Sequence, residues 1–426
     1  MKITAYIVMV LLCFVTPARA MTMADLFAAL REQPVTKLDT LQAHDSALGV
    51  QAVHDRFYPV LSGVMSYEKY NSPTNLRPVT PTESALLLAS DGSLPFSETI
   101  SRIGVSMSMP IFTKELFSLS KQAASISDSA QVKKRISLLE RQALLVGADA
   151  NLMHLDSLTK ALTSRKASLK KTWDDISLQV ATGRLPETEK IQLDEAINQI
   201  DLTFLQTSQQ ESELRKNIES LTGLFLEEPA PLQVNGALDE GELFALQPLQ
   251  KNIEAREFGV QAAKDKLYPA IVGTAQWFHN YGEAYNTGDD VDNEYGVLAL
   301  TLQMPLFNKP AYTAIQRAKV QLRREKMSFA RTKIDLEAKA RNLNTTLNLL
   351  GQSKELAQNS VKHQRELLKV AKVSYASRRM AQEEYLRFEE KVLTAEANYY
   401  LTEARWWETF VSLAVLYGNN LDELIQ

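Results

Sequence analysis

Two stretches of the chain alternate apolar and polar side chains with a period of two residues, the spacing of a β-strand with one apolar face. One face of the first stretch carries Leu61, Gly63, Met65 and Tyr67, and one face of the second carries Ile103, Val105, Met107, Met109 and Ile111. Small or polar residues such as Ser62, Ser66, Gly104, Ser106 and Ser108 occupy the positions between them. The pattern predicts strands at about 58–70 and 99–112.

The same pattern occurs a second time. Residues 49–59 return as residues 259–269, 210 positions later, with seven of eleven residues identical, and both copies end in Tyr-Pro. Alternating stretches follow again and predict strands at about 268–279 and 294–307. The chain is therefore a duplicated unit, and the segments 71–97 and 279–294 between paired strands are expected to be surface loops.

Each strand pair precedes about 67 residues that contain no proline or turn cluster, apart from Pro310 at the start of the second segment. At 1.5 Å per residue such a segment makes a helix roughly 100 Å long, which predicts helices at about 113–181 and 310–377. Apolar residues recur in them at 3-4 spacing, typical of a coiled-coil seam. The seam residues are Ile136, Leu139, Ala143, Val146, Ala150 and Met153 in the first helix, and Leu336, Ala340, Leu343, Leu347 and Leu350 in the second.

A return helix follows each long helix, at 187–223 and at 382–418. The turns that precede them are Gly183-Arg184-Leu185-Pro186 and Arg378-Arg379-Met380-Ala381, 195 residues apart. A stripe on the second return helix (Leu393, Ala397, Tyr400, Ala404, Trp407, Val411 and Ala414) is expected to pack against other helices. We therefore expect a first repeat at 21–226, a linker at 227–241 and a second repeat at 242–426.

Residues 1–20 combine Lys2, a short apolar run and Ala18-Arg19-Ala20, the pattern of a cleaved signal peptide. An uncleaved membrane anchor is the alternative, although the run is shorter than a spanning helix needs. The only cysteine, Cys13, lies in this segment. Without Lys2 and Arg19, 45 basic residues stand against 51 acidic ones, so the composition gives no indication of nucleic-acid binding.

No catalytic motif is apparent: the sequence lacks a phosphate-binding glycine loop, His-Glu-x-x-His, Gly-x-Ser-x-Gly and Cys-x-x-Cys. The five histidines show no metal-ligand spacing, so we expect no enzyme activity, no cofactor and no metal centre. The acidic pairs Asp174-Asp175 and Glu389-Glu390 are most simply solvated helix faces. The segment 289–292, with three aspartates, is either a calcium-binding loop or a plain acidic loop.

The predicted strands fit either a soluble sandwich or a membrane wall. Strands in lipid cannot leave an open edge, and four strands cannot close into a barrel. Three copies would supply twelve strands and twelve helical columns. We therefore expect a mainly helical α+β protein of two repeats, each with a short helix, a β-hairpin, a very long helix and a return helix. In this interpretation it is a homotrimer with a composite barrel in the outer-membrane lipid.

These features together resemble the TolC-like outer-membrane efflux proteins, over essentially the whole chain after the signal peptide. The resemblance rests on the Tyr-Pro strand entries, the strand exits Met109-Pro110-Ile111-Phe112 and Met304-Pro305-Leu306-Phe307, and the turn at Gly183. It implies a trimeric exit duct in the outer membrane of a Gram-negative bacterium, with a helical periplasmic tunnel. The implied partners are a periplasmic adaptor and, through it, an inner-membrane pump or ABC transporter, for efflux or type I secretion.

The resemblance also implies site residues. A constriction near the helical tips would involve Glu189, Glu384, Glu383, Arg379 and Arg387, and the tip turns that dock the adaptor would be Gly183, Arg184, Leu185, Arg378 and Met380. The alternative for the two glutamates Glu189 and Glu384 is an ordinary helix N-terminal position that the helix dipole favours. The second tip departs from the family, because Arg378 and Arg387 stand where glycine and an acidic residue are usual.

At the membrane the implied residues are the strand entries Tyr58-Pro59 and Tyr268-Pro269 and the aromatic girdle residues Tyr67 and Trp277. The pairs Asp55-Arg56 and Asp265-Lys266 are expected at the periplasmic end of the barrel, where charge is tolerated. A soluble periplasmic coiled-coil adaptor or scaffold is the alternative function. It would also need long helices, but it has no use for strands with an uninterrupted apolar face.

Overall fold

The computed structural model describes residues 21–377 and 379–425, without the side chains of Gln382, Glu383 and Leu386. The predicted signal peptide and Arg378 therefore lie outside the described residues. The first repeat contains α2 (Met23–Glu32), α3 (Pro34–His54), η2 (Asp55–Phe57), β1 (Val60–Asn75), α4 (Pro81–Ala89), β2 (Phe96–Thr113), α5 (Lys114–Ala181) and α6 (Glu187–Thr222). The second contains η3 (Phe244–Leu246), α7 (Gln247–Asp265), β3 (Ala270–Glu283), β4 (Asp290–Gln303), α8 (Lys309–Ala376), α9 (Gln382–Tyr417) and α10 (Leu421–Leu424).

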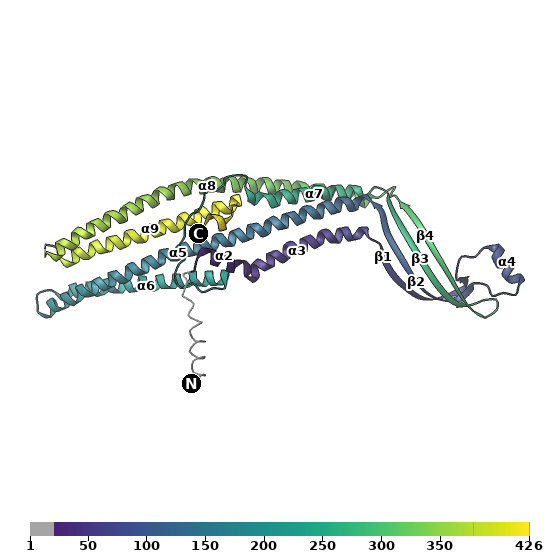
Figure 1. Ribbon diagram of the computed structural model, residues 1–426, viewed down its shortest axis with the longest axis horizontal. Helices are drawn as coiled ribbons and strands as arrows, with labels where there is room; N and C mark the ends of the chain where they lie inside the picture. The colour runs from purple at the N-terminus through teal and green to yellow at the C-terminus, as the bar shows by residue number, and fades with distance from the viewer. Residues whose placement is uncertain (1–20, 378, 426) are drawn as a thin grey trace, which may run out of the picture. The chain divides into compact units, whose positions relative to one another are not determined.

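This order confirms the predicted fold class: each repeat runs from short helix to β-hairpin to very long helix to return helix (Figure 1). The long helices α5 and α8 have 68 residues each, and the return helices α6 and α9 have 36 each. No helix among the described residues is both long enough and apolar enough to span a bilayer.

Contacts divide the chain into two compact units, and each unit draws on both repeats. One contains 43–131 and 248–330, and therefore the sheet with the adjoining helix ends; the other contains 132–247 and 331–426 with the N-terminal helix. The two hairpins form one antiparallel sheet with the order β1-β2-β3-β4. The β2–β3 ladder therefore joins the two repeats, and β1 and β4 are the edge strands.

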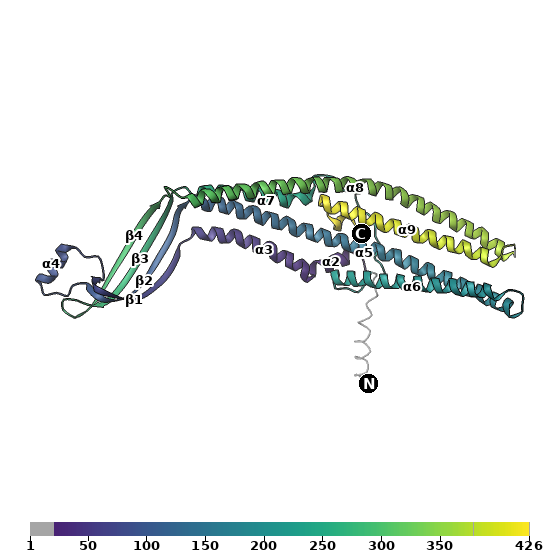
Figure 2. The ribbon, with the colours of Figure 1, turned by 180° about the vertical axis from the view of Figure 1, so that it is seen from behind.

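The helical unit has its own apolar core. Phe27 from α2, Val146 from α5, Ile218 from α6 and Trp407 from α9 are all buried in it. In this unit α6 lies beside α5, and α9 lies beside α8 (Figure 2). Lys166 contacts Asp201 at 2.5 Å in the first helix pair, and Arg365 and Lys354 contact Glu396 and Glu403, each at 2.6 Å, in the second. The stripe on α9 packs as expected, since Ala397, Ala404, Trp407, Val411 and Ala414 are buried.

The hairpin loops differ from the prediction. The segment 279–294 is mostly strand, because β3 continues to Glu283 and β4 begins at Asp290. The segment 71–97 contains the end of β1, the start of β2 and the helix α4, so it is not a simple surface loop. β4 ends at Gln303, four residues before the predicted end. Its neighbour β3 begins at Ala270, which pairs with Gln303, so Met304 has no partner strand within the chain.

Candidate functional site

One face of the sheet is apolar across all four strands over most of its height, and His279, Asp292 and Glu294 lie on the same face toward the hairpin loops. Residues that pair directly across neighbouring strands point to the same face, and the register aligns Leu61 with Met107, Met107 with Ala275 and Ala275 with Leu298. Large side chains on this face are exposed: Met65 is 80% exposed, Leu298 89% and Leu300 72%. A single chain thus leaves a continuous apolar surface without a covering layer.

The opposite face is polar and partly covered near the hairpin loops. Arg102 donates through Nε to the side-chain oxygen of Asn280 (2.9 Å) and lies 3.6 Å from Glu68. Asn280 is fully buried and donates to the backbone oxygen of Leu76. Leu76 is also fully buried. The segment before α4 therefore packs on the polar face.

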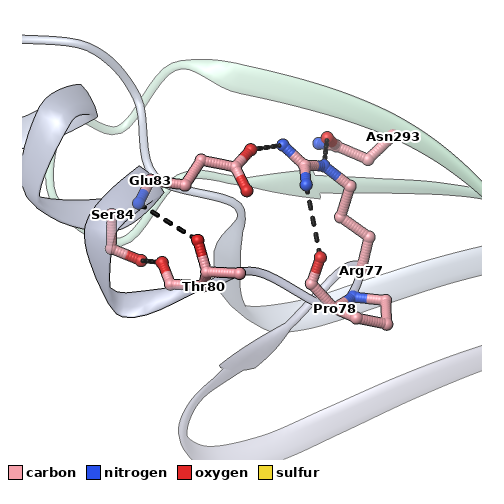
Figure 3. A network of polar contacts seen from close by, with 6 residues as sticks. All are labelled: Arg77, Pro78, Thr80, Glu83, Ser84 and Asn293. Carbon is pink, nitrogen blue, oxygen red and sulfur yellow. Dashed lines mark hydrogen bonds and ion pairs between the residues drawn. The ribbon is translucent and has the colours of Figure 1, made fainter.

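A network around Arg77 fixes the start of α4 on the same face (Figure 3). Arg77 donates to the side-chain oxygen of Asn293 on β4 (2.8 Å), to the backbone oxygen of Pro78 (3.2 Å) and to Glu83 in the first turn of α4 (2.5 Å). Thr80 caps the helix, because its hydroxyl oxygen accepts the backbone N–H of Glu83 at 3.2 Å. The loop is therefore anchored on a strand of the other repeat.

The two strand entries are built differently. Tyr58 is exposed, and so is Asp55 before it. In the second copy Asp265 is buried: it accepts hydrogen bonds from Ser118 (2.6 Å) and Gln261 (2.8 Å), and Lys114 lies 3.4 Å from it. Burial alone would raise the pKa of this carboxyl, but these three partners outweigh it and lower the pKa. The ammonium group of Lys114 also lies 3.4 Å from the ring centroid of Tyr268, just before Pro269.

Tyr67 and Trp277 both lie on the apolar face, at different heights. Tyr67 pairs with Ser101, which pairs with Tyr281, whereas Trp277 pairs with Val105 and through it aligns with Gly63. Trp277 is thus four residues from Tyr281, about 13 Å along the strand. The aromatic residue level with Tyr67 is Tyr281, which no pattern in the sequence indicated as a girdle residue.

Most of the segment 289–292 belongs to the sheet. Asp290 and Asp292 belong to β4, and the carboxylate of Asp289 accepts the hydroxyl of Ser93 at 2.7 Å. Within the described ranges, no group of three or more His, Cys, Asp or Glu residues is placed to hold a metal ion. His279 instead lies 2.9 Å from Glu294, its direct cross-strand neighbour. Of the two alternatives for this segment, these contacts favour an acidic segment that is largely part of the sheet.

The tip turn of the first repeat is a Schellman motif. Gly183 has a φ of +69°, which L side chains disfavour. Its N–H donates to Val180, and the N–H of Arg184 donates to Gln179, each at 2.9 Å. In the second repeat the N–H of Arg379 donates to Ser374, also at 2.9 Å, which matches the bond of Arg184. This bond of the first turn therefore has a counterpart in the second, and Arg378, which matches Gly183, is outside the described residues.

The side chains expected at the constriction point into solvent. Glu189 and Glu384 lie in the first turns of α6 and α9 and are exposed, as are Arg184, Arg379 and Arg387. Leu185 and Met380 are half-buried, and the side chain of Glu383 is not among those described. Among the ion pairs that the described residues form, none includes Glu189, Glu384 or Arg379.

The helices behind the tips carry contacts that the sequence did not indicate. Glu389 accepts the hydroxyl of Ser168 at 2.9 Å, and Arg165 lies 3.1 Å from Glu390. Glu390 is exposed, as expected of a solvated face, but Glu389 is half-buried, and α5 of the other repeat supplies partners to both. Tyr385 stacks on Tyr375 at 5.0 Å, and burial, helped by Glu389, raises the pKa of Tyr385 to about 12. These contacts link the two helix pairs close to the predicted constriction.

No protein-family model and no curated protein sequence matches the chain. Solved structures do. The outer membrane protein VceC of Vibrio cholerae aligns with a TM-score of 0.71 at 13% identity, over 93% of this chain and 96% of that one. The CmeC outer membrane channel of Campylobacter jejuni aligns with a TM-score of 0.71 at 16% identity (94% and 85%), and the open MtrE outer membrane channel of Neisseria gonorrhoeae with 0.72 at 13% (94% and 90%). The chain therefore has the fold of the TolC-like outer-membrane channels.

Proposed function

We propose that three copies of this chain form a passive exit duct in the outer membrane of a Gram-negative bacterium. The observation that carries the proposal is the four-stranded sheet, which has an exposed apolar face over most of its height and two open edge strands. An apolar face of this kind is stable against lipid, but unpaired backbone groups at β1 and β4 are not. Pairing β4 of one copy with β1 of the next removes both edges and yields a twelve-stranded barrel.

Two further observations support a spanning wall. β3 and β4 have 14 residues each, more than the roughly 9–11 residues that a tilted strand needs to cross a bilayer. The fold is also that of proteins whose structures are described as outer membrane channels. A soluble adaptor would have to expose Met65, Leu298 and Leu300 to water, which disfavours that alternative.

The proposal is tested by locating and sizing the full-length protein. We expect it in the outer-membrane fraction, extracted only by detergent, as a trimer by light scattering with mass corrected for detergent. In planar bilayers the purified trimer should form discrete conducting pores. A monomer that stays soluble in the periplasmic fraction without detergent would exclude the duct and favour the soluble adaptor.

We also propose that the tip turns dock a periplasmic adaptor, which connects the duct to an inner-membrane pump or ABC transporter. Gly183 and Arg184 are exposed, and Leu185 and Met380 are accessible in part, so the turns offer a small mixed surface. The transporter would select the cargo, whether a small molecule or a protein. The duct itself then needs no catalytic site.

The constriction is proposed to involve Glu189 and Glu384, whose three copies would place six carboxylates around one opening. Such a ring attracts cations, so the double change Glu189→Gln and Glu384→Gln should lower the cation-to-anion permeability ratio, measured as the reversal potential in a KCl gradient. Glu187→Gln, in the same first turn of α6, is the control. An unchanged ratio would assign the two glutamates to ordinary helix N-terminal positions.

The basic residues of the second tip call for a separate measurement. We propose that Arg379 and Arg387 contribute to ion pairs that form when the constriction is closed. Reversing both charges should then raise the conductance of the closed state in planar bilayers. If the closed-state conductance is the same as in the wild-type protein, these arginines have no role in closure.

A further inference from the structure

We propose that the three copies of α4 meet at the outer mouth of the barrel and close it as an apolar ring of three helices. This inference rests on the proposed trimeric duct. In this proposal the exposed surface of each α4 packs against the α4 helix of the next copy. Three features of the molecule support it: where α4 is anchored, how its side chains are distributed, and how large three such helices are.

The anchor places α4 on the inner side of the wall. Arg77 links Glu83, in the first turn of α4, to Asn293 on β4. Asn293 pairs with Asn280, and Asn280 pairs with Arg102, so these side chains share the polar face of the sheet. The other face carries the exposed leucines and must meet lipid. The polar face therefore lines the channel, and α4 begins on that side.

The side chains of α4 are distributed as a ring requires. Glu83, Ser84 and Leu87 are half-buried against their own chain, whereas Ala85 and Ala89 are exposed on the opposite side. Leu86 and Leu88 are 67% and 54% exposed. At 3.6 residues per turn they lie about 200° apart around the helix. One leucine therefore projects from each flank, and small residues lie between them.

A cyclic trimer needs two different patches on each subunit, because every copy contacts one neighbour on each side. Leu86 of one α4 can meet Leu88 of the next, and the two alanines can then face the threefold axis. Residues 84–89 carry no charge, and Glu83 is paired with Arg77. Three identical copies can thus approach without repulsion, and the contact removes leucines from water.

The dimensions agree. Twelve strands about 4.8 Å apart and tilted by about 40° give a barrel with a backbone diameter of roughly 24 Å. Three helices about 10 Å across, in mutual contact, fit inside a circle of roughly 22 Å. Because inward side chains make the opening narrower than the backbone diameter, three copies of α4 are large enough to cover it.

Disulfide cross-linking tests the ring. The only native cysteine is Cys13, in the predicted signal peptide, so the wild-type chain serves as the oxidation control. In full-length trimer in its membrane, Leu86→Cys with Leu88→Cys should, on oxidation, shift most of the protein to dimer and trimer bands on non-reducing denaturing gels. Leu86→Cys alone and Leu88→Cys alone should remain largely monomeric on the same gels, because each lacks its partner.

A second variant leaves both leucines in place. Ala85→Cys, facing the axis, should give dimers with a short bismaleimide, whereas Tyr285→Cys, an exposed position outside α4, should give none. If the protein is a trimer by light scattering but neither α4 variant cross-links, the ring is wrong and the duct is unaffected. A monomeric protein would instead refute the duct itself.

Discussion

Replacing Gly104 with valine is expected to abolish the assembled protein. Gly104 lies on β2, where a Cβ atom would be 2.3 Å from the carbonyl oxygen of Trp277 and 2.4 Å from the Cδ1 atom of Phe278. The carbonyl belongs to the backbone of β3, so it can move only if the β2–β3 ladder opens. That ladder is the connection between the two repeats. Overpacking against a backbone that cannot yield should cost about 3 kcal/mol, the upper end of the usual range.

The measurement is the amount of the proposed trimer recovered from the membrane fraction, together with its thermal midpoint in detergent. Gly63→Val is the matched control: Gly63 lies on β1, and a Cβ atom there meets nothing within 4 Å. The control should assemble normally, because its side chain points into the apolar face. Wild-type yield and midpoint for Gly104→Val would show that the β2–β3 ladder has room for a side chain at position 104.

The second large effect is expected at Asp149, a carboxylic acid in the core of the helical unit. Asp149 is fully buried, its Oδ1 accepts the N–H of Ala230 at 3.0 Å, and its Oδ2 has no partner among the described residues. Burial raises the pKa of the carboxyl from 3.8 to about 7, against the smaller opposing effect of the bond from Ala230. The folded state therefore holds the proton more tightly than the unfolded state.

The raised pKa of Asp149 should make the protein less stable as the pH rises. The favourable contribution of the protonated acid is complete below about pH 4 and is lost as the pH rises through about 7. Between pH 5 and pH 8 the wild-type protein should lose about 2–3 kcal/mol of stability from this group. Asp149→Asn keeps an acceptor for Ala230 and cannot ionise, so its stability should lack this loss and exceed that of the wild type at pH 8.

Denaturation of the helical signal at pH 5 and pH 8 measures the effect as a difference between variant and wild type. Asp174→Asn, an exposed position on the same helix, is the control and should leave the pH dependence unchanged. An equal difference between Asp149→Asn and wild type at both pH values would mean that Asp149 does not become neutral on folding.

The sequence predicted the fold because the two kinds of periodicity are long and are repeated. Alternation at 103–111 and its copy identified the hairpins, and the absence of proline identified the long helices. The strand ends were less well predicted, because an end depends on the neighbouring strand. β4 ends at Gln303 because its partner, Ala270, is the first residue of β3. The sequence of 294–307 alone does not indicate this end.

The helix α4 was missed although its start carries a signal. Thr80, Pro81 and Glu83 form the sequence of a capped helix N-terminus, with the acidic residue three positions after the cap. The run Ala85 to Ala89 lacks amphipathic periodicity, because its three leucines are consecutive and only one faces the protein. Amphipathic periodicity indicates a helix only when its apolar side chains face the core of its own chain, and those of α4 do not.

Residues near the predicted constriction show a further limit of sequence reasoning. Glu389 and Glu390 are one acidic pair among several, and only the packing of α9 against α5 gives them Ser168 and Arg165 as partners. Asp265 and Asp55 occupy equivalent places in the repeat, yet only Asp265 is buried. Duplication predicts that the two copies of a residue occupy equivalent positions in the fold. It does not predict their contacts, since the contacting residues come from different parts of the chain.

The two edge strands also bear on how the protein matures. In a single chain in water, Leu298 and Leu300 on β4 are exposed and the outer edge of β4 has no hydrogen-bonding partner. Such an edge favours aggregation. In the proposed trimer, β4 finds its partner only on another polypeptide. Closure of the barrel then requires association of separate chains, so its rate should rise more steeply than in proportion to chain concentration. Aggregation through the same open edge would compete with it.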